Sequence, residues 1–349
     1  MTKKAENIIV GISVGDLNGI GSEVILKSFE DPRILELCTP VIFANVKTVS
    51  FVKKNLNLQA QLHGIDTIEQ LLTGKINVLN IWRDNVNIEY GKLDNEIGKY
   101  AIQSFTAATK ALKDNQIDVL VTAPISKANI QSDDFKFPGH TDYLNQELEG
   151  NALMFMIQDN LRVGLLTDHV PINEVAKHLT PELIIQKIKT INQSLIQDFG
   201  IRKPKIAVLG LNPHSSDNGV IGKEEDTIIK PTLKKIFDDG IMVFGPFPAD
   251  GFFGSHQNEK YDAVIATYHD QGLIPFKTLS FGKGVNYTAG LNKVRTSPDH
   301  GTAFEIAGKN QADPSSFTDA IYAAIDIYRS RNTYLEITEK PLKIKEKQL

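Results

Sequence analysis

The sequence predicts an α/β fold built on a mainly parallel sheet, and three observations support this prediction. Short runs rich in β-branched residues recur along the 349-residue chain. The longer segments between them repeat apolar residues every three or four positions, which is the period of a helix with one buried face. No internal repeat or low-complexity segment interrupts this alternation. Alternating strands and helices are typical of parallel sheets that are covered by helices on both faces.

The strand-like runs and the helical patterns can be taken in chain order. The strands are expected at residues 8–13 (IIVGIS), 40–44 (PVIFA), 118–122 (DVLVT), 163–167 (VGLLT), 205–209 (KIAVL) and 263–267 (AVIAT). Amphipathic helices are expected at residues 95–115 and 181–197, and a further helix near residues 315–328. The strand runs are largely apolar rather than alternating, which is typical of strands that are buried on both faces.

Composition and charge exclude several classes of protein. Hydrophobic residues make up 41% of the chain and charged residues 23%, which is ordinary for a globular protein. The formal charge is 38 − 42 = −4, so no excess of positive charge indicates nucleic acid or an anionic membrane as partner. The single cysteine, Cys38, allows no intrachain disulfide and suits a reducing compartment. With neither a signal peptide nor a membrane-spanning run, we expect a soluble cytoplasmic protein.

Three histidines follow three of the predicted strands. They are His169 in GLLTDH, His214 in GLNPH and His269 in YHD. Ligand sites of open α/β sheets lie outside the carboxyl ends of the strands, and neutral imidazole is a common metal ligand. The histidines are therefore candidates for one shared metal site. Their separations of 45 and 55 residues match no local metal motif, so three unrelated loop histidines remain the alternative.

Acidic residues accompany these histidines. Asp250 ends the segment FGPFPAD, and Asp270 follows His269 directly. Each is a candidate for a metal ligand, for a partner that orients an imidazole, or for a general base. The alternative is that each caps the helix that follows, which is common after a strand. For Asp168, beside His169, we favour this capping role.

Two glycine-containing segments bear on nucleotide binding. Residues 299–314 (DHGTAFEIAGKNQADP) combine a glycine turn with small residues, so that backbone amides near Gly301 and Thr302 could approach a nucleotide while Glu305 accepts hydrogen bonds from a ribose. A plain loop that leads into the next helix explains the segment almost as well. Residues 15–21 (GDLNGIG) lack the G-x-G-x-x-G spacing of a dinucleotide fingerprint. We interpret them as a strand-to-helix turn that lines the cleft.

Basic residues gather late in an otherwise acidic chain. Lys277, Lys283, Lys293 and Arg295 fall within about twenty residues of one another. Arginine and lysine beside glycine turns commonly hold phosphate groups. A solvated basic loop is the alternative.

Together these segments resemble the 4-hydroxythreonine-4-phosphate dehydrogenase family. The resemblance extends from Val10 to about Tyr328, and its motifs occur in the family's order. The motifs are residues 15–21 (GDLNGIG), 122–128 (TAPISKA), 138–144 (PGHTDYL), 210–214 (GLNPH), 245–250 (GPFPAD), 268–273 (YHDQGL) and 295–301 (RTSPDHG). The family belongs to a wider group with isocitrate and isopropylmalate dehydrogenases, whose members carry a similar loop for the adenosine end of NAD.

The resemblance implies roles for particular residues. His169, His214 and His269 would bind one divalent metal ion (Zn, Mg or Co), with Asp250 and Asp270 as the candidate catalytic carboxylates. The residues implied in substrate binding are His140, Thr141, Lys277, Asn286 and Arg295. Those implied along the adenosine of NAD, with NADP as the alternative cofactor, are His300, Gly301, Thr302, Glu305 and Ile306.

The resemblance also implies an architecture. It predicts two α/β/α domains around a central cleft, as in isocitrate and isopropylmalate dehydrogenases. Residues 1–125 with 285–349 would form the first domain and carry the nucleotide loop. Residues 126–284 would form the second and carry most of the metal and substrate ligands. A homodimer with active sites shared between the chains is implied as well.

The implied reaction is the NAD-dependent oxidation of 4-phosphohydroxy-L-threonine in vitamin B6 biosynthesis. Its product, 2-amino-3-oxo-4-phosphohydroxybutanoate, would lose CO2 to give 3-amino-2-oxopropyl phosphate. Leu17 stands where many relatives have proline, and residues 286–293 (NYTAGLNK) are less typical of the family. A D-threonate or D-erythronate 4-phosphate dehydrogenase is therefore an alternative. A metal-dependent phosphatase is an alternative from a different class, but it would leave residues 299–314 unexplained. A regulator that binds a nucleotide without catalysis is a third, but it would not need the three histidines.

Overall fold

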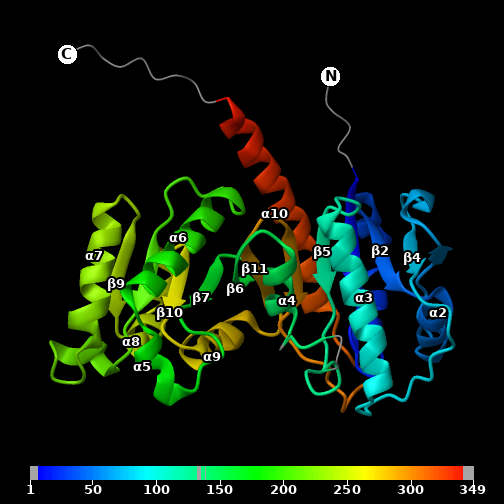
Figure 1. Ribbon diagram of the computed structural model, residues 1–349, viewed down its shortest axis with the longest axis horizontal. Helices are drawn as coiled ribbons and strands as arrows, with labels where there is room; N and C mark the ends of the chain where they lie inside the picture. Colours follow the sequence, from blue (N-terminus) through cyan, green and yellow to red (C-terminus); the bar gives the residue numbers. More distant parts are fainter. Residues whose placement is uncertain (1–6, 132–134, 138, 341–349) are drawn as a thin grey trace.

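The computed structural model describes residues 7–131, 135–137 and 139–340. Within these residues one twelve-stranded sheet crosses the molecule in the order β3-β4-β2-β1-β5-β12-β11-β6-β7-β10-β8-β9 (Figure 1). The strands are β1 Ile8–Ser13, β2 Cys38–Ala44, β3 Leu62–Ile65, β4 Ile76–Asn80, β5 Val119–Thr122, β6 Gly150–Gln158, β7 Leu161–Leu165, β8 Ile206–Leu209, β9 Val243–Phe247, β10 Ala263–Ala266, β11 Val285–Leu291 and β12 Val294–Pro298.

The sheet is mainly parallel, as predicted. One parallel set runs from β3 to β12, and a second contains β7, β10, β8 and β9. Antiparallel pairs join the two sets: β12 with β11, β11 with β6, and β6 with β7. The two predicted domains therefore share one continuous sheet. Their boundaries near residues 125 and 285 stay a prediction.

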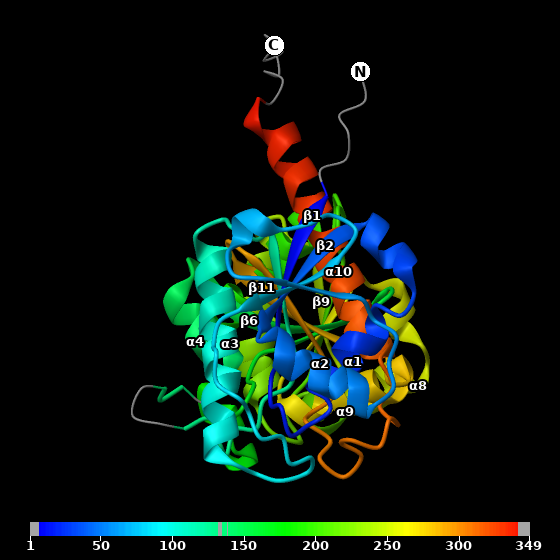
Figure 2. The same ribbon diagram turned by 90° about the vertical axis from the view of Figure 1, so that its right-hand side faces the viewer.

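Helices cover both faces of the sheet, which confirms the predicted α/β class. Figure 2 shows α3 and α4 on one side of the strands and α1 and α10 on the other. The α-helices are α1 Gly21–Ser28, α2 Val46–Asn55, α3 Asn95–Lys113, α4 His140–Glu147, α5 Val175–His178, α6 Pro181–Gln197, α7 Lys230–Asp238, α8 Ala249–Gly254, α9 His269–Ser280 and α10 Ser315–Glu339.

The hydrophobic core is divided by the sheet. On one face a single cluster joins side chains of α1, α2, α6, α7 and α10 to strands from both halves of the sheet. On the other face, α3 and α4 pack on the first half of the sheet, and α8 and α9 pack on the second half. The two halves are therefore joined by shared core as well as by strand pairing.

A buried polar network stabilises the middle of the molecule. The Arg331 guanidinium of α10 donates to Asp198 at 2.8 Å and to the Tyr287 hydroxyl at 2.8 Å. Tyr287 in turn donates to Asp198 at 2.6 Å, and burial beside this carboxylate raises the pKa of Tyr287 well above its usual value. Because these residues come from α10, α6 and β11, the network ties together segments on either side of the predicted domain boundary.

Cys38 begins β2 and is 0% exposed. Its Sγ lies 3.5 Å from the carbonyl oxygen of Ile34. Burial raises the pKa of this thiol to about 12. Among the described helices, none is both long enough and apolar enough to cross a bilayer.

Candidate functional site

The three histidine-bearing strand ends lie side by side. Strand β10 pairs in parallel with both β7 and β8, so the carboxyl ends of all three strands fall on one edge of the sheet. The Thr167 amide donates to the Thr267 carbonyl at 3.2 Å, and the Gln271 side chain donates to the Gly210 carbonyl at 2.7 Å. These bonds hold the loops beyond β7, β10 and β8 together, as expected from the positions of the histidines.

His169 and His269 are neighbours in this group. Their ring centroids lie 5.8 Å apart, with an angle of 41° between the ring planes. The Asp270 carboxylate lies 2.7 Å from Nδ1 of His269. A carboxylate on one ring nitrogen fixes the tautomer and leaves the other nitrogen available to a ligand. Asp270 is therefore placed to orient an imidazole.

His214 lies in an unusual turn. Residues 214 to 219 all have positive φ, from 44° to 86°, and we call this segment the left-handed turn. Each residue other than glycine costs roughly 1–2 kcal/mol in this conformation. Asn218 and Gly219 tolerate it best, whereas Ser215 and Ser216 are not among the residue types that favour it. The surrounding structure must therefore hold this turn in place.

The donor set suits a divalent metal, although the described side chains are not gathered around a common point. Three imidazoles at adjoining strand ends are the chemistry of a site that leaves positions open to substrate. In the described part of the chain, no group of three histidine, cysteine or carboxylate side chains lies close enough together to hold a metal ion. The structure thus brings His169 and His269 together and leaves His214 in the adjoining turn.

Arg295 is a buried cation without a carboxylate partner in the described structure. It is 2% exposed, and its guanidinium donates to Thr122 Oγ1 at 2.5 Å and 3.1 Å and to Thr288 Oγ1 at 3.1 Å. The Nη2 atom also lies 3.2 Å from Nδ1 of His140. Burial lowers the pKa of Arg295 to about 9. A charge buried among neutral groups is costly unless an anion joins it, so this cluster is suited to an anionic ligand.

His140 and Asn286 present unused polar atoms in this region. Nε2 of His140 and Oδ1 of Asn286 are buried without a hydrogen-bond partner. Burial lowers the pKa of His140 well below its usual value, so its ring is neutral at pH 7. The register Asn286↔Ser297 places Thr288 opposite Arg295, which puts Asn286 and Arg295 on the same face of the sheet. Orphaned polar atoms beside a buried cation are what a bound polar ligand would satisfy.

Lys277 and Thr141 lie at the edges of this group. Lys277 in α9 donates from Nζ to the Asp299 carbonyl at 2.9 Å, just beyond the end of β12. Thr141 is half-buried in the first turn of α4, next to His140. The predicted substrate residues thus come from α4, α9, β11 and β12. The Pro138 that opens their motif lies outside the described residues.

Charged side chains from two sides of the sheet act on His169. Burial lowers the pKa of His169, and the nearby positive charge of Lys127 lowers it further, while the carboxylates of Asp168 and Asp142 oppose the shift. Lys127 follows β5 and Asp142 lies in α4, so both come from the side that holds Arg295. Sequence reasoning missed both residues, although each lies in a quoted motif, TAPISKA or PGHTDYL.

The predicted nucleotide loop rests on the turn that follows β1. The Ile20 amide donates to the Thr302 carbonyl at 3.0 Å. A Cβ atom on Gly19 would lie 2.8 Å from the same carbonyl oxygen, so only glycine allows this approach. Residues 15–21 therefore support the loop and connect β1 to α1 as predicted, and their place along a cleft stays a prediction.

The far end of the loop is anchored by α1. The Ala312 amide donates to the Glu23 carboxylate at 2.9 Å, and Lys27 Nζ donates to the Ala312 carbonyl at 2.8 Å. Glu23 and Lys27 also form an ion pair at 2.8 Å. Both ends of the loop are thus fixed to the first strand-to-helix connection, which leaves residues between them free to present a binding surface.

Within the loop, Glu305 is exposed. Lys309 Nζ donates to its backbone carbonyl at 2.7 Å rather than to its carboxylate. His300 has Nδ1 3.0 Å from the Gly301 carbonyl, and its Nε2 is buried without a hydrogen-bond partner. Ile306 is half-buried. The Glu305 carboxylate is accordingly accessible to a ligand.

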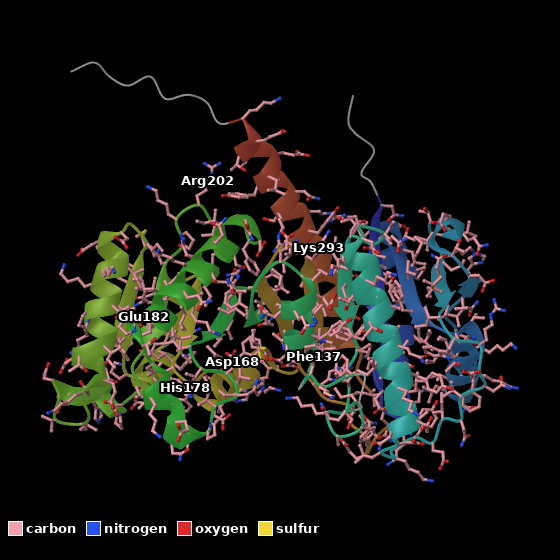
Figure 3. All side chains as sticks on the ribbon, in the orientation of Figure 1. Phe137, Asp168, His178, Glu182, Arg202 and Lys293 are labelled. Carbon is pink, nitrogen blue, oxygen red and sulfur yellow. The ribbon has the colours of Figure 1, made fainter. Side chains whose placement is uncertain are left out.

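Two expectations about carboxylates have different outcomes. Asp168, labelled in Figure 3, was expected to cap the following helix, and this is wrong. The next helical turn has Pro171 as its N-cap, and the Asp168 carboxylate instead lies 3.4 Å from Lys187 Nζ on α6. Asp250 is exposed in the first turn of α8, and its catalytic role stays a prediction.

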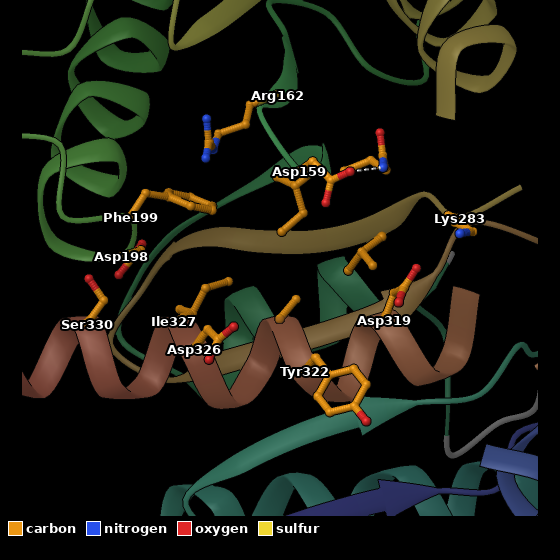
Figure 4. Close-up of a pocket in the computed structure, with 14 residues that line it drawn as sticks. Asp159, Arg162, Asp198, Phe199, Lys283, Asp319, Tyr322, Asp326, Ile327 and Ser330 are labelled. Carbon is orange, nitrogen blue, oxygen red and sulfur yellow. Dashed lines mark hydrogen bonds between the residues drawn. The ribbon is translucent and has the colours of Figure 1, made fainter. Parts of the chain in front are cut away.

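The four late cations do not form one basic cluster. Arg295 is buried among threonines, and Lys293 contacts Asn115, which precedes β5. Lys283 lines a cavity of about 510 Å³ between α10 and the hairpin of β6 and β7 (Figure 4). Arg162 lies in the same cavity, 4.6 Å above the Phe199 ring. The lining includes none of the predicted catalytic, metal, substrate or cofactor residues.

The comparisons with known proteins agree with this geometry. The family model described as pyridoxal phosphate biosynthetic protein PdxA matches residues 36–324. The chain belongs to the PdxA family. A relative from Bacteroides thetaiotaomicron, named 4-hydroxythreonine-4-phosphate dehydrogenase, is 47% identical over 338 residues, which cover 96% of this chain and 93% of that protein.

Two further PdxA relatives help to define the range of the family. A crystal structure of 4-hydroxythreonine-4-phosphate dehydrogenase from Klebsiella pneumoniae has a TM-score of 0.80 and 31% identity, and the match covers 93% of this chain and 99% of that one. A protein from Oceanobacillus iheyensis, provisionally named a D-threonate 4-phosphate dehydrogenase, is 34% identical over 94% of this chain and 98% of its own length. The α/β fold and the oxidoreductase class of the chain follow from these matches.

Proposed function

We propose that this PdxA-family enzyme oxidises 4-phosphohydroxy-L-threonine with NAD, in the synthesis of vitamin B6. The observation that carries the proposal is the buried Arg295 guanidinium, which has only neutral partners among the described residues and lies beside orphaned polar atoms. The substrate carries a phosphate and a carboxylate, and either anion would complete this cluster. The 47% identity to the relative of that name supports the same substrate.

The chain's own residues have distinct tasks in this proposal. Arg295 and Lys277 bind the anionic groups of the substrate by charge-assisted hydrogen bonds. The neutral ring of His140 and the amide of Asn286 orient the substrate through their unused Nε2 and Oδ1 atoms, and Thr141 lies beside them in α4. Asp250 and Asp270 are the candidates for taking the proton from the C3 hydroxyl, which must leave before hydride passes to NAD.

His169, His214 and His269 would hold one divalent ion, with Zn, Mg and Co as candidates. Such an ion, when bound, makes a coordinated hydroxyl more acidic. Asp270 would fix the tautomer of His269, because its carboxylate lies 2.7 Å from Nδ1. The oxidised product is a β-keto acid, and it loses CO2 to give 3-amino-2-oxopropyl phosphate.

NAD binds along residues 300–306, with His300, Gly301, Thr302 and Ile306 beside the adenosine. The two anchored ends of the loop and the exposed Glu305 carboxylate support this placement. A carboxylate accepts hydrogen bonds from the ribose hydroxyls and repels a 2′-phosphate. The proposal therefore makes NAD the preferred cofactor and NADP a poorer one.

We expect Glu305→Gln to narrow the preference for NAD over NADP, because it removes the charge that repels the 2′-phosphate. Lys309 does not offset this charge directly, since it binds the Glu305 carbonyl. The measurement is kcat/KM with each cofactor before and after the substitution. Glu182→Gln, an exposed carboxylate on α6, is the matched control and should leave the ratio unchanged. A native preference for NADP, or an unchanged ratio in Glu305→Gln, would count against this role.

We further propose a homodimer in which each active site takes residues from both chains. Large apolar side chains are exposed near two of the histidines in the sequence: Ile172, three residues after His169, is 70% exposed, and Ile274 in α9, the helix that begins with His269, is 64% exposed. Exposed apolar side chains grouped near a site are typical of subunit contacts. Light scattering of the purified chain tests the dimer. The cytoplasmic location proposed from the sequence stays a prediction.

D-Threonate 4-phosphate is the second candidate substrate, because a relative with 34% identity carries that provisional name. Purified enzyme with NAD and a divalent metal should be assayed for NADH formation with both phosphorylated acids, and for release of free phosphate. A higher kcat/KM for 4-phosphohydroxy-L-threonine supports the proposal, and a higher value for D-threonate 4-phosphate overturns it. Phosphate release without NAD would favour the phosphatase alternative.

A further inference from the structure

Asn212, which lies just before the left-handed turn that carries His214, is hydrogen-bonded to two carboxylates. The backbone N–H of Asn212 donates to the Glu225 carboxylate at 2.7 Å. Its side-chain Nδ2 donates to the second oxygen of Glu225 at 2.8 Å and to Glu224 at 2.8 Å. Two carboxylates thus fix the residue that precedes the Pro213–His214 pair.

Other hydrogen bonds connect Asn212 and its neighbours to the turn. The Ser215 amide donates to the Asn212 carbonyl at 3.1 Å, and its hydroxyl donates to the Pro246 carbonyl at 3.0 Å. The Gly210 carbonyl, two residues before Asn212, accepts from Gln271 of α9 at 2.7 Å. Asn212 therefore connects the carboxylate pair to the segment that carries His214 and to the helix that begins with His269.

Glu225 itself is unusual in two respects. It is 0% exposed, and no ion pair found among the described residues includes it. It also begins a five-residue π-helical turn, Glu225–Ile229, which leads into α7. Short π-helical segments occur frequently at functional sites. A buried carboxylate that uses both oxygens on one asparagine is costly to desolvate, which calls for a function beyond helix stability.

We propose that Glu225 is a positioning residue for His214. Through Asn212 it holds residues 214 to 219 in the left-handed turn and presents the His214 imidazole to the metal. The inference rests on the metal site of the proposed function, and it names a residue that acts on this site without touching the metal. Partners that orient metal ligands typically change metal affinity about 10- to 100-fold when they are replaced.

The test is the affinity of the full chain for Co²⁺, followed by the visible absorption of the bound ion. Glu225→Gln keeps the size of the side chain but turns an amide nitrogen toward Asn212, so that one hydrogen bond is lost. We expect its dissociation constant for Co²⁺ to rise about tenfold or more. Asp238→Asn is the matched control, because it removes an exposed carboxylate from the neighbouring α7. That control should bind Co²⁺ like the native chain.

A second variant and a second measurement distinguish a positioning role of Glu225 from a purely structural one. Asn212→Asp places a carboxylate against Glu224 and Glu225 and should weaken Co²⁺ binding as well. Combining it with Glu225→Gln restores a donor and acceptor pair and should recover part of the affinity. Binding of NAD, measured by fluorescence, should be unchanged in all folded variants. A uniform loss of NAD and Co²⁺ binding would instead assign Glu225 to the stability of the fold.

The outcomes separate this inference from the proposed function. If the native chain does not bind Co²⁺ at micromolar concentrations, the metal site itself is wrong. If the native chain binds Co²⁺ and a folded Glu225→Gln binds it equally well, the positioning role of Glu225 is overturned while the metal site stands.

Discussion

Replacing His214 with alanine is expected to lower kcat by at least about a thousandfold. A divalent ion that acidifies the substrate hydroxyl by about five pKa units removes roughly 7 kcal/mol from the cost of deprotonation. Loss of one of three protein ligands should release the ion and with it most of this effect. The measurement combines the metal content of the dialysed variant with kcat for NADH formation.

The control for this substitution is His178→Ala. His178 is an exposed histidine at the end of α5, labelled in Figure 3, and it lies outside the three strand-end loops. Its replacement should leave both metal content and kcat unchanged. A metal-free His214→Ala protein with full turnover would show that the proposed site is not used in the reaction.

Replacing Arg295 with methionine is expected to raise KM for the phosphorylated substrate about 10- to 100-fold. A hydrogen bond between charged groups is worth roughly 1.5–3 kcal/mol. Among the described residues, Arg295 has no carboxylate partner that could compete with the substrate. The free energy of unfolding should not fall, because the substitution removes a buried charge that no ion pair compensates. The expected result is therefore a higher KM for the phosphorylated substrate with no fall in the free energy of unfolding.

Lys293→Met provides the comparison for Arg295→Met. It removes the same charge from the residue that precedes the same strand, where Lys293 contacts Asn115. KM for the substrate should change little in this variant, and KM for NAD should change little in both. An unaltered substrate KM in a folded Arg295→Met protein would contradict the proposed anion-binding role.

Six strands with parallel neighbours, β1, β2, β5, β7, β8 and β10, were readable from the sequence because they are continuous apolar runs, whereas the parallel strands β3, β4 and β9 were not predicted. Residues 8–13 and 263–267 are predicted almost as they occur in β1 and β10. The antiparallel strands β6, β11 and β12 were not predicted. The pairing of β6 with β11 joins residues more than a hundred positions apart, as in Val285↔Ile157, and no local pattern encodes such a register.

The strand ends that carry the site could be predicted from the sequence, but the directions of the side chains could not. A polar residue after a buried strand indicates an edge of the sheet, which is why His169, His214 and His269 were expected to adjoin. The direction of a side chain depends on contacts that sequence spacing does not fix. Asp168 therefore turned to Lys187 instead of capping a helix, and Lys283 and Lys293 separated from Arg295.

The left-handed turn at His214 could not be predicted from the sequence, for a related reason. Its sequence, HSSDNG, contains asparagine and glycine at the end, which indicates a turn but not its length. The carboxylates of Glu224 and Glu225, which bind Asn212, follow it by 12 and 13 residues. Only the folded chain shows that these acids face Asn212.

Labelling of the Cys38 thiol can report how often the structure around the start of β2 opens. It is the one cysteine in the sequence, it is fully buried, and its pKa of about 12 keeps it protonated at neutral pH. Since the thiolate is the reactive form, a maleimide should label only molecules in which the start of β2 has opened. Ligands that bind the native state alone slow such labelling in proportion to their occupancy. The affinities for metal and for dinucleotide can therefore be measured on the unmodified chain without any turnover.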